Sequence, residues 1–145
     1  MLFGTDRNTL RRTFAEAWRR RVTGLVLEPL EARIAQVVEA HPEYHAVVQD
    51  SDSLHRDYAP EDGQTNPFLH MAMHLALLEQ RATDRPPGIA RALERVDLKL
   101  GDPHAAEHEA MECLGRVMWE AQRSGTAPDE HSYLECVRRL GHRRR

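Results

Sequence analysis

The sequence has few of the residues that mark disulfide-rich or membrane-spanning proteins. Only 2 of its 145 residues are cysteines, Cys113 and Cys136, and the absence of a Cys-x-x-Cys pair excludes a disulfide framework and a zinc ribbon. We expect both to be buried free thiols. No apolar run approaches the roughly 18 residues needed to cross a bilayer, and the start MLFGTDRNTL has no signal-peptide pattern. The sequence therefore predicts a cytoplasmic protein without a membrane partner.

The sequence also lacks the alternation of apolar and polar residues that is typical of β-strands, and it has no Asn-Gly hairpin signal. Apolar residues recur at helical spacing instead. The class we predict is all-α: one up-down bundle of four to five main helices over residues 1–145, ending in a basic tail at about 141–145. The helices are expected at 6–23, 29–40, 67–82, 89–100, 103–124 and from 129 onward. A short kinked piece at 43–50 and a long loop at 51–65 follow the second helix.

Helix start and stop signals support these boundaries. Asn66-Pro67 and Asp102-Pro103 each place an N-cap residue before a proline at the first helical position. Pro42 interrupts the second helix, and Gly125 ends the helix that begins at Pro103. The helix from Pro67 is apolar nearly all round, which indicates a buried helix.

The net charge of the chain limits the classes of macromolecule that it is expected to bind. A formal net charge of -3 argues against a general nucleic-acid binder. The arginines of the first helix lie opposite an apolar stripe, so we interpret them as its solvated face. The sequence names no partner, and it leaves open whether the chain forms a homo-oligomer.

Histidine is the residue in excess, with 9 in 145. Six of them form three pairs with the same spacing of four, which places each pair on one helical face. Short connections favour antiparallel neighbours, and such a topology would bring the three pairs to one end of the bundle. The pairs are His41/His45, His70/His74 and His104/His108.

Histidines four apart can chelate one metal ion from a single helix face. Imidazoles and carboxylates on facing helices hold transition metals in helical bundles, and this donor set suits iron, zinc, manganese or nickel without choosing among them. The sequence thus predicts a transition-metal site, in a metal-dependent enzyme or a sensor, and identifies no catalytic residue. The candidate ligands are His70, His74, His104 and His108, with His41 and His45 as additions and Glu107 and Glu112 as carboxylate ligands or orienting groups.

The alternative is a non-enzymatic structural or interaction module, in which the buried histidines hydrogen-bond one another and the 51–65 loop. A bis-histidine haem site is a third variant.

Several stretches carry a family resemblance. LEPLEARIAQVVEAHPEYH, NPFLHMAMHLALLEQ, TDRPPGI and HEAMECLGRVMWEAQR, with neighbouring segments, resemble the bacterial domain-of-unknown-function family 1841 (DUF1841) over nearly the whole chain. The resemblance implies a small bacterial protein and transfers no activity. The site is also similar, more loosely, to those of DinB and hemerythrin metal-binding bundles, although the histidine and glutamate spacings of those families are not reproduced.

Overall fold

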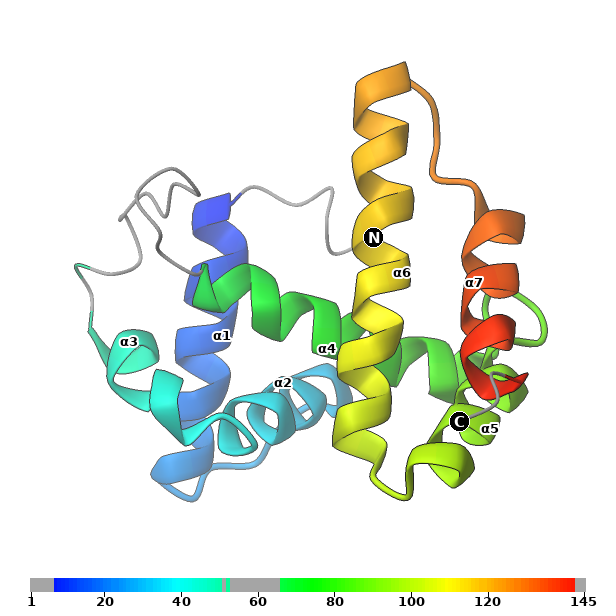
Figure 1. Ribbon diagram of the computed structural model, residues 1–145. Coiled ribbons are helices and arrows are strands. Elements are labelled where there is room, and N and C mark those ends of the chain that lie inside the picture. The colour runs from blue at the N-terminus through cyan, green and yellow to red at the C-terminus, as the bar shows by residue number, and fades with distance from the viewer. Residues whose placement is uncertain (1–6, 51, 53–65, 143–145) are drawn as a thin grey trace. The chain divides into compact units, whose positions relative to one another are not determined.

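The computed structural model describes residues 7–50, 52 and 66–142 of the chain, and these residues form seven α-helices and one short 3-10 helix (Figure 1). No strand occurs within these ranges, which confirms the all-α prediction. None of the described helices is long and apolar enough to cross a lipid bilayer. The predicted 51–65 loop, apart from Asp52, and the last three residues of the basic tail lie outside the described residues.

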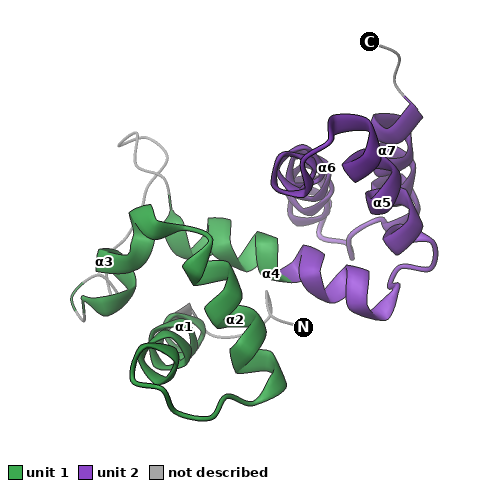
Figure 2. Ribbon diagram, turned by 90° about the horizontal axis from the view of Figure 1, so that it is seen from below, with its two compact units in different colours: residues 1–75 green, residues 76–145 purple. Residues whose placement is uncertain are grey.

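The chain divides into two compact units, Met1–Leu75 and Ala76–Arg145 (Figure 2). Helix α4 (Pro67–Thr83) contributes its first part to unit 1 and its remainder to unit 2. That the whole chain is one domain stays a prediction.

Unit 1 is built on helix α1 (Arg7–Val22), which packs against α2 (Pro29–Glu39) and α3 (His45–Gln49). The 3-10 helix η2 (Pro42–Tyr44) joins α2 to α3. The start of α4 also reaches this core, where the rings of Phe14 and Phe68 meet edge to face at 6.5 Å between centroids. Both phenylalanines are essentially fully buried, so apolar burial fixes α4 on α1.

Helix α2 ends where the sequence predicts. It begins with a capping box, in which the Glu31 carboxylate accepts from the backbone N–H of Glu28 at 2.9 Å, and Pro29 occupies the first helical position. Its last residue is Glu39, and Pro42 opens the 3-10 turn that follows. The break predicted at Pro42 is therefore confirmed, and it places His41 in the junction between the two elements.

Unit 2 contains α5 (Ile89–Leu100), α6 (Pro103–Ser124) and α7 (Glu130–His142), and each of the three packs against the other two. Leu93, Val96, Val117 and Val137 are buried among them. Helices α5 and α7 approach closely at Gly141, because a Cβ atom there would lie 3.1 Å from the Cβ of Arg95. Arg81 near the end of α4 donates two hydrogen bonds to the Asp97 carboxylate, at 2.8 and 2.9 Å.

Both predicted Asx-Pro helix starts are confirmed. The Asn66 side chain accepts from the backbone N–H groups of Phe68 and Leu69 at 3.1 Å each. The Asp102 side chain accepts from the backbone N–H of His104 at 3.0 Å. These caps satisfy N–H groups that a helix leaves without an internal partner.

The prediction of free thiols is wrong. Cys113 on α6 and Cys136 on α7 form a disulfide, with an S–S distance of 2.05 Å and a Cα–Cα distance of 5.8 Å. The two residues are 23 positions apart without a motif around them. Their pairing follows from the packing of α6 on α7, which spacing along the chain does not reveal.

Candidate metal centre

Three histidine rings lie together in unit 1. The ring centroid of His41 is 5.2 Å from that of His70 and 4.6 Å from that of His74, and the last two are 4.9 Å apart. His41 follows the end of α2, whereas the other two lie in the first two turns of α4. The end of α2 therefore meets the start of α4, as predicted. His41 and His74 are buried, so their ring nitrogens are largely shielded from water.

Backbone geometry sets the tautomer of His41. Its Nδ1 lies 2.7 Å from the carbonyl oxygen of Val37, one turn earlier in α2. A carbonyl only accepts, so Nδ1 must carry the proton and donate. In the neutral ring the lone pair is then on Nε2, which is the arrangement found in most metal-binding histidines.

His70 and His74 face each other through their Nε2 atoms, which are 3.3 Å apart. In the absence of a metal, one of these nitrogens must carry a proton and donate to the other. Two nitrogens bound to one tetrahedral zinc ion at about 2.0–2.1 Å would be about 3.3–3.4 Å apart. The observed distance fits both a hydrogen bond and a shared ion.

Tyr44 is a member of this cluster that the sequence reasoning missed. Its ring stacks on that of His41 at 5.7 Å and meets the ring of His70 edge-on at 5.9 Å. Burial, with a smaller contribution from the Glu43 carboxylate, raises the pKa of the Tyr44 phenol, so the ring is a neutral wall beside the histidines. The feature of the sequence that could have identified Tyr44 is its position three residues after His41.

Unit 2 supplies a second pair. The rings of His104 and His108 lie 4.4 Å apart and meet edge-on, in the first two turns of α6. Both residues are exposed. The Asp102 cap fixes the first turn of this helix and thereby the direction in which the pair projects.

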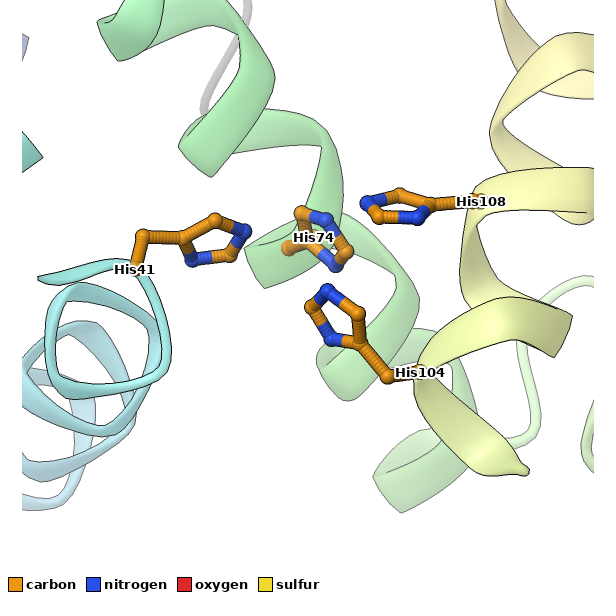
Figure 3. A group of neighbouring side chains, drawn as sticks. All are labelled: His41, His74, His104 and His108. Atoms are coloured by element: carbon orange, nitrogen blue, oxygen red, sulfur yellow. The ribbon is translucent and has the colours of Figure 1, made fainter. Parts of the chain in front are cut away.

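Four of the predicted ligands are candidates to hold a metal ion: His41 and His74 of unit 1, and His104 and His108 of unit 2 (Figure 3). Each offers one ring nitrogen. That the three histidine pairs meet at one end of one bundle stays a prediction.

The other predicted ligands lie outside this group. His70 neighbours it through its contact with His74. His45 packs its ring against Trp18, at 4.5 Å between centroids, and its Nε2 donates to the carbonyl of Val38 at 2.8 Å. Glu107 is half-buried on α6 and Glu112 is exposed. The group is therefore made of imidazoles alone.

A family model described as "Domain of unknown function (DUF1841)" matches residues 6–139. The chain belongs to the DUF1841 family. Neither the curated proteins nor the solved structures that were compared contain a match, so the likeness to DinB and hemerythrin bundles stays an expectation.

The DUF1841 match includes the whole histidine group together with Tyr44 and both cysteines. It names no reaction for the family.

Proposed function

We propose that this DUF1841 protein binds one late transition metal ion through His41, His74, His104 and His108. The observation that carries the proposal is that each unit holds a pair of adjacent imidazoles, His41 with His74 in unit 1 and His104 with His108 in unit 2, and each of the four has one ring nitrogen to offer. The hydrogen bond from His41 to Val37 adds support, because a ligand imidazole is held and oriented in this way by its second ring nitrogen.

The donor set narrows the choice of metal. Imidazole suits zinc, copper, iron and nickel, whereas manganese prefers carboxylate and water oxygens. Because the four residues of the group include no carboxylate, we favour zinc or nickel over manganese. Four protein ligands fill a tetrahedral zinc ion and leave no position for a reactive water. The proposed role is therefore to hold or sense the metal rather than to hydrolyse a substrate.

Exposure differs between the two halves of the group. His41 and His74 are 4% and 2% exposed, whereas His104 and His108 are exposed. The buried pair would exclude water from one side of the ion, and the exposed pair would admit the ion from solution. This arrangement favours an exchangeable metal.

The test is a zinc titration of the untagged, chelator-treated protein by calorimetry. We expect about one equivalent of zinc to bind. Because ligand residues contribute at least as much as their supporting partners, His74→Ala and the pair His104→Ala plus His108→Ala should each lower the affinity by more than about tenfold. The control is His131→Ala, an exposed histidine at the start of α7.

The variants also test whether one ion uses both pairs. If the His74 variant leaves the binding of zinc to His104 and His108 unchanged, the pairs do not share an ion and the proposal is refuted. The absence of zinc binding in the unaltered protein would refute it as well.

A second candidate rests on the hydrogen bonds. His41 and His45 each donate to a backbone carbonyl, and His70 contacts His74 directly, as expected of histidines that only support the fold. Under this alternative, His74→Ala costs about 1–3 kcal/mol of unfolding free energy whether or not zinc is present. Under the metal proposal, zinc raises the stability of the unaltered protein by about 2.7 kcal/mol at one hundred times its Kd, and the same zinc concentration raises that of the variant by less than about 1.4 kcal/mol.

A further inference from the structure

Unit 1 has a cleft of about 510 Å³ between α1 and α3. Small-molecule sites usually have volumes of roughly 300–1,000 Å³, so the cleft has room for a small organic molecule. It is lined by Arg12, Ala15, Glu16, Trp18, Arg19, Val22, Thr23, Val48 and Gln49.

One part of the lining is apolar. Ala15, Trp18 and Val22 come from α1, and Val48 comes from α3. Val22 is 60% exposed, although a valine gains roughly 1.5–3 kcal/mol when it is fully buried. An apolar ligand body in the cleft would cover this side chain.

The charged part of the lining carries an excess positive charge. The Glu16 carboxylate accepts two hydrogen bonds from Arg19, at 2.7 and 2.9 Å, so these two charges balance. Arg12 is exposed and makes no ion pair or hydrogen bond with any residue in the described ranges. The cleft therefore offers one uncompensated guanidinium, which is suited to a carboxylate.

A buried donor lies in the same wall. Trp18 is 8% exposed, and its indole Nε1 has no hydrogen-bond partner among the described residues. Leaving a buried donor unsatisfied costs about 1–3 kcal/mol, and such groups are rare in native proteins. Because Nε1 itself is covered, an acceptor can reach it only if a side chain that covers it moves aside.

We propose that this cleft binds a small monocarboxylate with an apolar body. The apolar body would contact Val22, Val48 and the Trp18 ring, while the carboxylate would pair with Arg12 and accept from the indole N–H. The proposal is independent of the metal site, because none of the lining residues is a histidine.

The two tryptophans allow a direct test. In a Trp119→Phe variant, Trp18 is the only tryptophan of the chain, so its indole N–H gives a single resonance in a nitrogen-15 NMR spectrum. The probes are 4-phenylbutyrate and its uncharged amide, 4-phenylbutyramide. We expect the carboxylate to shift this resonance downfield in a saturable manner, and to bind about fivefold more tightly than the amide through one partly exposed ion pair.

Two further variants identify the contacts. Arg12→Gln should remove the preference for the carboxylate over the amide, and Ala15→Leu should weaken both probes by filling the cleft. Arg116→Gln, which alters an exposed arginine of α6, is the control and should bind as the parent does. A Trp18 resonance that does not respond to millimolar carboxylate, or a carboxylate preference that survives Arg12→Gln, overturns the proposal.

Discussion

Reduction of the Cys113–Cys136 disulfide should destabilise unit 2. The bond closes a loop with a sequence separation of 23 residues between α6 and α7. The loop-closure entropy that such a bond removes from the unfolded chain corresponds to about 3 kcal/mol at 25 °C. With a urea slope of about 1.5 kcal/mol/M, the unfolding midpoint of the reduced protein should be about 2 M lower.

Tryptophan fluorescence can follow each unit. Trp18 is in α1 of unit 1 and Trp119 is in α6 of unit 2, so Trp18→Phe and Trp119→Phe variants leave one reporter each. We expect the transition reported by Trp119 to move on reduction. If both reporters move together, the two units unfold as one cooperative domain, as the sequence predicts for residues 1–145.

A serine variant provides the control. Cys136 is only half-buried, so Cys136→Ser removes the bond at small cost to packing. This variant should match the reduced protein, and reducing agent should not affect it. A midpoint that moves by less than about 0.5 M would refute the loop-entropy reasoning, since it corresponds to under about 0.8 kcal/mol.

Three further predictions concern local contacts. Burial raises the pKa of the Tyr133 phenol, whereas the phenol of the unfolded chain ionises above a pH of about 10. The unfolding free energy should therefore keep its full value below pH 10 and fall by about 1.4 kcal/mol per pH unit above it, as measured by urea unfolding. Asp102→Ala should cost about 1 kcal/mol of unfolding free energy, because the bond that caps α6 at His104 is lost. Arg81→Met should cost about 1–3 kcal/mol in the same assay, because it leaves the largely buried Asp97 carboxylate without its two donors.

Matched controls separate these effects from general perturbation. Tyr133→Phe should remove the alkaline destabilisation, and Asp102→Asn should retain most of the cap. Arg138→Gln breaks an exposed pair with Glu135 and should change stability by no more than about 0.5 kcal/mol. A loss as large as that of Arg81→Met would contradict the role assigned to burial.

The helix boundaries were predictable because their signals are local. Asn66, Asp102 and Pro42 act on the backbone within one turn, so a single sequence contains all that determines where α4, α6 and η2 begin. The same is true of Gly125, which takes a φ of 67° after α6.

The candidate site was predictable only in part. A spacing of four places two histidines on one face of their own helix. The rings are indeed adjacent in the His70/His74 pair and in the His104/His108 pair. Spacing does not fix how that face is rotated toward other elements. For this reason it did not show that Tyr44 covers His41, or that Glu107 lies outside the four-histidine group. The disulfide was missed on the same grounds, since it depends on how α6 packs on α7.

The bond between His41 and Val37 has a kinetic consequence. Because the proton of the neutral ring is held on Nδ1, an incoming cation finds the lone pair on Nε2 and need not wait for a tautomer exchange at this residue. In stopped-flow mixing, the rate of metal binding at His41 should therefore be limited by the release of water from the cation. Nickel loses its hydration shell more slowly than zinc, so it should bind more slowly.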